Sequence, residues 1–297
     1  MAILVFDFGG TSIKYGVCYQ DELLDLSHFF TPDNWEECKK KILEVKQNFD
    51  NSYDLLGVAF SMPGCVDQES GRILGYSGIR YIHDRLIEKE LTELLELPIS
   101  IENDANCAAL AEASLGIAKD ASRVLFAVVG TGIGGAIVKD GKIDTGAHLY
   151  GGEFGFMYLC EDRKLGFQSL SELASPVAMA RRYCEKLGIP QDSHSGKDIF
   201  KFATEGDKFA KKEVDNFYKY LGVGLYNLQV SFDPDIIVIG GAISVDTQII
   251  VNLENKVNEM LEGVNILDFK AKLIPCFYKN DANLVGAVRY FHIKYEK

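Results

Sequence analysis

The sequence predicts an α/β protein made of two domains with similar folds, and three observations support this prediction. Short apolar runs typical of buried strands alternate with helical patterns along the whole chain. The opening pattern of a buried strand, a Gly-Thr turn and a second strand recurs with an offset of 120 residues, so that Gly10-Thr11 matches Gly130-Thr131. The length of 297 residues fits two ordinary domains or one large one. The alternative explanation for the recurrence at 120 residues is that any α/β protein contains several strands followed by glycine turns.

The first half of the chain opens with three predicted strands. Ala2–Phe8 is apolar except for Asp7, which is typical of a buried strand. Ile13–Tyr19 and Glu22–Phe30 follow, separated by the turn residues Gln20-Asp21. The next predicted elements are a helix over Trp35–Gln47, a strand over Tyr53–Ser61, a helix over Asp84–Leu95 with its leucines on one side, a strand over Pro98–Glu102, and a small-residue helix over Ala105–Leu115 closed by Gly116.

The second half repeats the strand and turn pattern and then becomes mostly helical. Val124-Leu125-Phe126 and Ala136–Lys139 are predicted strands on either side of the second Gly-Thr turn, and Asp140-Gly141 is the next turn. The later predicted elements are helices near Leu170–Leu187, Lys197–Thr204 and Lys208–Val230, a strand over Ile236–Ile239, a helix over Ile249–Leu261, and a last helix that begins near Ala282. The domain junction is predicted near residues 116–122, where no low-complexity linker separates the halves.

Charge and composition exclude several classes of function. The chain has 31 Lys and Arg against 43 Asp and Glu, a net charge of −12, which argues against a nucleic-acid or anionic-membrane surface. A small anionic ligand is still compatible, because backbone N–H groups can hold it. The seven cysteines include no CxxC pair, which suits a reducing compartment, and no apolar run approaches the roughly 18 residues of a membrane span. We therefore expect a cytoplasmic protein without nucleic-acid or membrane partners.

The glycine run Gly130–Gly135 satisfies the GxGxxG pattern of dinucleotide-binding proteins, and Glu153 follows at a compatible distance. That pattern must open a helix, whereas Ala136–Lys139 is predicted to be a strand. An oxidoreductase with a nicotinamide cofactor is therefore the weaker alternative. A phosphate cradle built from two hairpin turns fits better, because glycine lets the backbone approach phosphate oxygens and Thr11 and Thr131 add hydroxyl donors.

Other residues near these turns can contribute to nucleotide binding. Asp7 precedes the first turn and is a candidate for holding Mg²⁺ directly or through water, although an aspartate also commonly starts a turn. Lys14 can contact a phosphate or be a solvated strand lysine. Gly240-Gly241 follows an apolar strand and is either a third nucleotide contact or a plain strand-to-loop turn.

Asp104 is the catalytic candidate. It lies between the predicted strand Pro98–Glu102 and the helix that starts at Ala105, where a carboxylate at a strand end is well placed for chemistry. As a general base it would take the proton from a substrate hydroxyl that attacks the γ-phosphoryl group, while Asn103 would hydrogen-bond neighbouring hydroxyls. The competing interpretation is that Asp104 is a helix N-cap.

Taken together, the motifs resemble those of the ROK family of repressors, open reading frames and sugar kinases, within the actin-like ATPase superfamily. The resemblance runs almost from end to end. The motifs that carry it are Asp7-Phe8-Gly9-Gly10-Thr11, Met62-Pro63-Gly64-Cys65-Val66-Asp67, Glu102-Asn103-Asp104-Ala105-Asn106, Gly130-Thr131-Gly132-Ile133-Gly134-Gly135, Gly151-Gly152-Glu153-Phe154-Gly155, Gly240-Gly241-Ala242 and Leu284-Val285-Gly286-Ala287.

The resemblance implies two RNase H-like domains with an interdomain cleft that binds ATP, Mg²⁺ and a sugar. It implies an N-terminal sugar- and phosphate-binding domain over residues 1–118, completed by the helix 282–297, and a nucleotide-binding and dimerisation domain over 119–281. The catalytic-base role falls on Asp104. The implied substrate contacts are Gly64, Asn103, Asp104, Glu153 and Phe156, and the implied nucleotide contacts are Asp7, Gly9, Gly10, Thr11, Lys14, Gly130, Thr131, Gly132, Gly240 and Gly241. The family also suggests a homodimer.

The chain departs from the family pattern in the substrate region. Many members have a histidine where this chain has Phe156 and then a cysteine cluster that binds zinc, but here only Cys160 follows, so we predict no structural zinc. Ser171 stands where members commonly have a second sugar-binding glutamate. Since the missing groups usually hold the C1/C2 end of a hexose, the substrate is either a β-glucoside that stacks on Phe156 or, if Phe156 only packs, glucose, N-acetylmannosamine or another N-acetylhexosamine. A non-catalytic sugar sensor is the alternative from another class, and the intact Asp7 and Asp104 argue against it.

Overall fold

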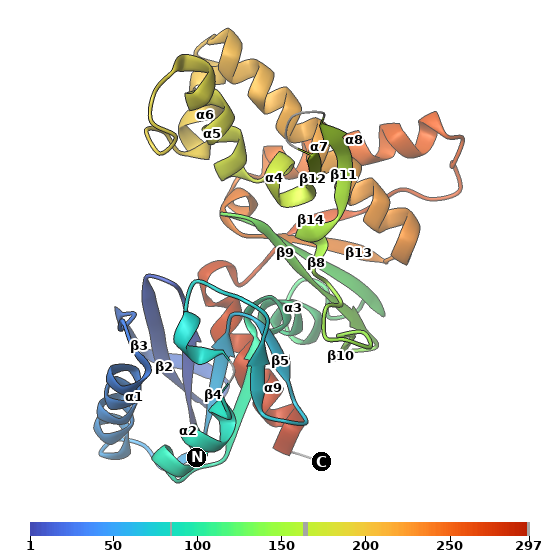
Figure 1. The fold of residues 1–297 in the computed structure, drawn as a ribbon. Helices are drawn as coiled ribbons and strands as arrows, with labels where there is room; N and C mark the ends of the chain where they lie inside the picture. The colour runs from blue at the N-terminus through green and yellow to red at the C-terminus, as the bar shows by residue number, and fades with distance from the viewer. Residues whose placement is uncertain (84, 163–165, 296–297) are drawn as a thin grey trace. The chain divides into compact units, whose positions relative to one another are not determined.

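Residues 1–83, 85–162 and 166–295 are described by the computed structural model, and they form two compact units (Figure 1). The first unit contains Met1–Lys119, Thr145–Tyr150 and Asn280–Lys297, and the second contains Asp120–Asp144 and Gly151–Lys279. The C-terminal helix therefore belongs with the N-terminal half. Thr145–Tyr150 also belongs with the first unit, although its place in the chain had put it in the predicted segment 119–281.

The first unit is built on a five-stranded sheet in the order β3-β2-β1-β4-β7, in which β1 is antiparallel to β2 and parallel to β4. Its strands are β1 Ala2–Phe8, β2 Ser12–Tyr19, β3 Glu22–Phe30, β4 Leu55–Met62 and β7 Ile99–Asn103, and its helices are α1 Trp35–Asp50, α2 Ile87–Leu95, α3 Asp104–Ser114 and α9 Ala282–Tyr295. A short hairpin of β5 Cys65–Asp67 and β6 Arg72–Leu74 and the 3₁₀ turn Arg80–Ile82 complete it, while the 3₁₀ turn Lys279–Asp281 spans the boundary in the chain between the second unit and the first.

The side chains of β1 alternate between two helical layers, because successive residues of a strand point to opposite faces of the sheet. Leu4, Phe6 and Phe8 pack with the core that includes α1 and α2. Ile3 and Val5 pack with α3 and α9 instead. All seven residues of β1 are buried, which explains why the strand is apolar except for Asp7.

The second unit repeats this arrangement with a sheet in the order β10-β9-β8-β13-β14. The hairpin of β8 and β9 is antiparallel, and β13 runs parallel to β8, as β4 does to β1. The strands are β8 Arg123–Val129, β9 Ile133–Lys139, β10 Lys142–Ile143, β13 Ile236–Gly240 and β14 Leu273–Pro275, and β11 Tyr158–Asp162 with β12 Gly166–Ser169 forms a separate hairpin. The recurrence of the strand and Gly-Thr turn is therefore a true structural repeat, and the predicted α/β fold with two similar sheets is confirmed.

The helices of the second unit are α4 Leu170–Ala174, α5 Pro176–Leu187, α6 Gly196–Thr204, α7 Lys208–Phe232 and α8 Thr247–Gly263, with 3₁₀ turns at Phe154–Phe156 and Ala242–Val245. The single helix predicted near Leu170–Leu187 is wrong in one respect. It is divided at Ser175, whose side chain caps α5, because Pro176 cannot continue the preceding hydrogen-bonding pattern. In the first unit α2 begins at Ile87 rather than at Asp84, and Asp84 itself lies outside the described residues.

Because β9 follows Gly132 directly, the glycine run 130–135 opens a strand and not a helix. A dinucleotide fingerprint needs the N-terminus of a helix at this point, so the nicotinamide-dependent alternative is wrong for this chain.

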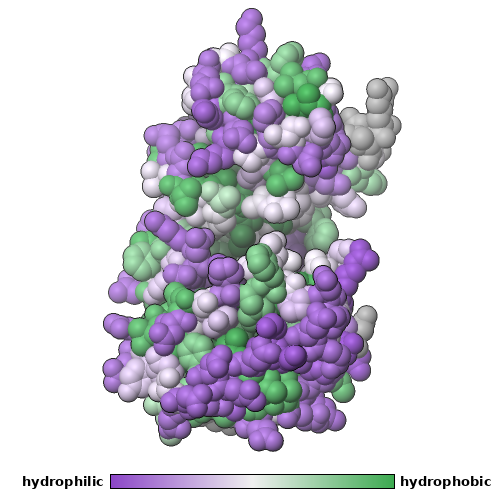
Figure 2. Space-filling model, turned by 90° about the vertical axis from the view of Figure 1, so that its left-hand side faces the viewer, coloured by the Kyte–Doolittle hydropathy of each residue, from purple (hydrophilic) through white to green (hydrophobic). Residues whose placement is uncertain are grey.

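Hydrophilic side chains predominate on the face drawn in Figure 2, and hydrophobic ones form small separate patches. In the described part of the chain, no helix combines the length and the apolar character needed to cross a bilayer.

Candidate active site

In the first unit, the predicted site residues gather at one edge of the sheet. Asp7, Ser61 and Glu102 are neighbours in register across the parallel strands β1, β4 and β7. The segments that follow these strands therefore leave the sheet at the same carboxyl edge, which is where ligands bind in open α/β sheets. They are the glycine turn Gly9–Thr11, the loop that contains Gly64, and the start of α3 at Asp104.

The side chain of Asp7 is buried and accepts two hydrogen bonds. Its Oδ1 accepts hydrogen bonds from the Ser61 hydroxyl at 2.9 Å and from Asn283 Nδ2 at 2.9 Å. Burial raises the pKa of Asp7, and the two hydrogen bonds oppose that shift. Lys14 is the antiparallel partner of Asp7 in β2, and its Nζ donates to the carbonyl of Asn280 at 3.1 Å.

The first glycine turn is closed by its own backbone. The Gly9 N–H donates to the carbonyl of Ser12 at 3.1 Å, and the Thr31 hydroxyl donates to the carbonyl of Gly9 at 2.6 Å. Gly10 and Thr11 lie exposed at the tip. This leaves the tip accessible to an anion such as a phosphate.

The start of α3 distinguishes between the two interpretations of Asp104. Asn103 is the N-cap, because its Oδ1 accepts from the Asn106 N–H at 3.1 Å. Asp104 is the first residue inside the helix, and its Oδ1 accepts from the Ala105 N–H at 2.8 Å. The N-cap interpretation of Asp104 is therefore wrong, and the structure assigns the capping role to its neighbour.

Hydrogen bonds of the Asn103 and Glu102 side chains hold the start of α3 in place. Asn103 Nδ2 donates to the carbonyl of Gly64 at 3.0 Å, and Gly64 has a φ of +106°, which favours glycine. The buried Glu102 Oε1 accepts from the Asn103 N–H at 2.7 Å and from Asn106 Nδ2 at 2.9 Å. Burial raises the pKa of Glu102. Glu102 was not predicted as a site residue, and the signal that could have found it is a lone charged side chain at the end of an apolar strand.

In the second unit, two glycine turns lie at the carboxyl edge of the sheet. Gly130–Gly132 follows β8, and the Gly130 N–H donates to the carbonyl of Gly132 at 2.9 Å. Gly240 is paired in register with Val128, so the Gly240-Gly241 turn leaves the sheet beside the first one. Gly241 has a φ of +81°, and a Cβ there would collide with the carbonyl of Val129. A side chain is excluded at this position because it would collide with the Val129 backbone and because this φ favours glycine.

The segment Gly151–Phe156 carries the predicted substrate contacts of this unit. Phe154 is buried in the core, whereas Phe156, two residues later, is 70% exposed. Glu153 is half-buried, and burial raises the pKa of its carboxyl. Phe156 therefore does not pack into the core, and its ring is available to a ligand.

Metal binding was also predicted from the sequence. The two hydrogen bonds described for Asp7 both go to Oδ1, so a contact to Mg²⁺ would use Oδ2, directly or through water. Within residues 1–83, 85–162 and 166–295, no cluster of three or more His, Cys, Asp or Glu side chains could hold a metal ion. Part of the segment downstream of Cys160 lies outside the described residues.

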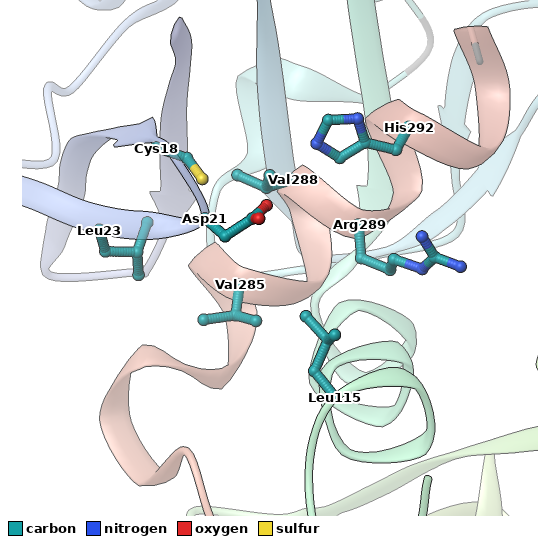
Figure 3. Close-up of a pocket in the computed structure, with 8 residues that line it drawn as sticks. All are labelled: Cys18, Asp21, Leu23, Leu115, Val285, Val288, Arg289 and His292. Carbon is teal, nitrogen blue, oxygen red and sulfur yellow. The ribbon is translucent and has the colours of Figure 1, made fainter.

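A small cavity elsewhere in the first unit is separate from these residues. It has a volume of about 110 Å³ and lies beside α9, as Figure 3 shows. Its lining consists of Cys18, Asp21, Leu23, Leu115, Val285, Val288, Arg289 and His292, and includes none of the predicted site residues. Ligand pockets commonly have volumes of about 300–1,000 Å³, so this cavity is too small for a sugar.

Comparison with known proteins identifies the family. The family model described as the ROK family matches residues 3–293. The chain belongs to the ROK family. Among individual ROK-like proteins, a β-glucoside kinase of Listeria monocytogenes is 33% identical over 98% of this chain and 97% of its own length.

Solved structures agree with this family assignment. A ROK family protein of Streptococcus pneumoniae, solved in complex with sucrose, has a TM-score of 0.89 and 32% identity, with 99% of each chain covered. A ROK family glucokinase of Streptomyces griseus, solved with glucose and AMPPNP, has a TM-score of 0.79 and 25% identity, with 98% of this chain and 99% of that one covered. The two sheets described above therefore belong to the ROK sugar kinase fold.

Proposed function

We propose that the protein is an ATP-dependent sugar kinase that phosphorylates the 6-hydroxyl of a hexose unit, and that its substrate is a β-glucoside. The observation that carries the kinase proposal is the start of α3. Asp104 lies at the carboxyl edge of the sheet while Asn103, and not Asp104, caps the helix. Its carboxylate is therefore not needed for the cap, and it can serve as a base. The similarity to kinases that act on sugars supports the same conclusion.

In this proposal Asp104 accepts the proton of the sugar hydroxyl as the hydroxyl oxygen attacks the γ-phosphorus, and the bond from that phosphorus to the ADP oxygen breaks. Asn103 donates or accepts hydrogen bonds to neighbouring sugar hydroxyls, and the carbonyl of Gly64 fixes the orientation of its amide. Glu153 is a further sugar contact in the second unit.

Nucleotide binding is assigned to backbone groups. The turns at Gly9–Thr11, Gly130–Gly132 and Gly240-Gly241 would donate N–H groups and hydroxyls to the phosphates, with Lys14 as the added cation. Mg²⁺, when bound, neutralises phosphate charge, and Asp7 would hold it through phosphate or water. Backbone donors explain how a chain with a net charge of −12 can bind ATP without a basic surface.

The β-glucoside substrate is proposed from the second unit. Phe156 offers an exposed aromatic face next to Glu153, and sugars and aryl groups stack on such faces. The relative named a β-glucoside kinase and the structure solved with sucrose support a substrate with a substituent at C1. A homodimer and a cytoplasmic location stay predictions from the family resemblance, and size-exclusion chromatography with light scattering tests the first.

A coupled assay of ADP release tests the proposal. The purified chain is given ATP, Mg²⁺ and one sugar at a time: cellobiose, an aryl β-glucoside, glucose or N-acetylmannosamine. We expect the highest kcat/KM for a β-glucoside. Faster turnover of glucose would refute the substrate, and binding of sugars without turnover of any would refute the kinase proposal in favour of the non-catalytic sensor.

A further inference from the structure

The phosphate turn and the substrate segment of the second unit are packed directly against each other. A Cβ on Gly152 would come within 2.7 Å of the Gly135 carbonyl and 2.8 Å of the Ala136 Cα. A Cβ on Gly155 would collide with the carbonyl of Ile133. Real Cβ atoms do not approach so closely, so both glycines let the 151–156 segment lie on β9 just after the phosphate turn.

Helix α4 ties these two segments together through its first two residues. The Leu170 N–H donates to the carbonyl of Met157 at 2.8 Å, and Met157 is the residue directly after the substrate segment. The Ser171 hydroxyl accepts from the Ile133 N–H at 2.9 Å and donates to the Ile133 carbonyl at 3.2 Å. A hydroxyl has one donor and two acceptor sites, so both bonds can form together.

The Ser171 hydroxyl also lies between the two glycine segments. Its Oγ is 3.5 Å from the position that a Cβ on Gly132 would take, and it would collide with a Cβ on Gly155. Ile133 is the first residue of β9, directly after the turn Gly130–Gly132. Ser171 therefore contacts the strand at the point where the phosphate turn ends and the substrate segment crosses it.

We propose that Ser171 is a positioning residue that sets the spacing between the phosphate-binding turn Gly130–Gly132 and the substrate segment Glu153–Phe156. Its hydroxyl both donates to and accepts from the Ile133 backbone, so its role is to hold the turn. This inference rests on the proposed functions of those two segments. Because the bonds fix one segment against the other, loss of the hydroxyl is expected to affect nucleotide and sugar together.

The test compares Ser171→Ala with Ser169→Ala. Ser169 is the N-cap of the same helix, and its hydroxyl bonds to Glu172 rather than to β9. Both variants lose one hydroxyl and some stability of α4. Well below both melting temperatures, Ser171→Ala is expected to raise the KM for ATP and for the sugar and to lower kcat/KM by about 10-fold or more, since small misplacements of reacting groups are costly. Ser169→Ala is expected to keep wild-type kinetics.

A second measurement does not depend on turnover. AMPPNP is added to each protein without sugar, and the ligand-induced rise in melting temperature is recorded. The rise is expected to shrink in Ser171→Ala and to match wild type in Ser169→Ala. If Ser171→Ala does not fold, Ser171→Cys replaces it, because a thiol is a weak donor and acceptor of similar size.

Equal kinetics and equal AMPPNP shifts in the two variants would overturn the role of Ser171. A wild-type chain that binds AMPPNP but phosphorylates no sugar would instead refute the proposed function. In that case the AMPPNP comparison still decides whether Ser171 positions the phosphate turn.

Discussion

Replacing Asp104 with asparagine separates catalysis from helix stability. The variant keeps the shape of the side chain, and its carbonyl oxygen can still accept from the Ala105 N–H, which is bonded at 2.8 Å in the structure. The cap of α3 is untouched, because Asn103 provides it. The substitution removes the negative charge and the ability to accept a proton.

The expected loss of stability is much smaller than the expected loss of kcat. A lost charge in the first turn of a helix costs about 0.3–1 kcal/mol, which in a chain of this size lowers the melting temperature by at most about 4 °C. A lost general base costs about 10²–10⁴-fold in kcat, or roughly 2.7–5.5 kcal/mol. The expected result is therefore a large loss of kcat with a small loss of stability and nearly unchanged nucleotide binding.

The assay is ADP release at saturating sugar and ATP, together with thermal melts with and without AMPPNP. Asp207→Asn is the matched control, because Asp207 caps α7 by accepting from the Phe209 and Ala210 N–H groups at 2.8 Å and is not a predicted site residue. We expect it to keep wild-type kcat. If Asp104→Asn retains kcat within about threefold of wild type, Asp104 is only a charge at the helix start and the proposed mechanism fails.

Three further predictions concern other parts of the two units. Phe156→Ala is expected to raise the KM for an aryl β-glucoside by about 2- to 10-fold, the value of one aromatic contact, while glucose kinetics and the melting temperature stay unchanged; an equal effect on glucose would contradict aglycone stacking. Burial raises the pKa of the Glu102 carboxyl in the folded protein above its ordinary 4.5, whereas the amide in Glu102→Gln does not titrate. The free energy of unfolding of the wild type should therefore fall relative to that of the variant as the pH rises from 4.5, and the fall should end once the pH has passed the folded-state pKa of Glu102. Melts between pH 4 and pH 8 check this, and a pH-independent difference would argue against it. Gly155→Ala is expected to destabilise the second unit by about 1–3 kcal/mol or more, because the new Cβ would collide with the Ile133 carbonyl. Denaturant titrations measure this loss. Gly134→Ala is the control and should change stability far less, because the space around its Cβ position is open.

Local sequence patterns were enough to predict several features of the fold. The mostly apolar β1 and the Gln20-Asp21 turn have strong local signals, because strand burial favours apolar residues and left-handed turn positions favour turn residues. The repeat at an offset of 120 residues correctly predicted two similar sheets. The strand after Gly132 also correctly ruled out the dinucleotide fold.

What the sequence left open depended on exact local geometry in one case and on contacts between distant residues in others. Whether Asp104 or Asn103 caps α3 is decided by a hydrogen bond three residues along, and both residue types are good caps. The partner of Asp7 is Asn283, separated by 276 positions, which no local pattern can reveal. The buried role of Glu102 and the bonds of Ser171 to Ile133 likewise exist only once the strands and helices are packed.

The sequence by itself therefore determined most of the longer strands and helices, the repeat and the motif residues, because these depend on periodicity and residue type. Tertiary structure alone decided which motif residues share a sheet edge, since register across β1, β4 and β7 brings Asp7, Ser61 and Glu102 into one row. It also decided that Phe156 is exposed while Phe154 is buried, although both are phenylalanines two residues apart. The physical reason is that burial and hydrogen-bond partners are properties of the packed chain, and the same residue type serves the core or a ligand according to its neighbours.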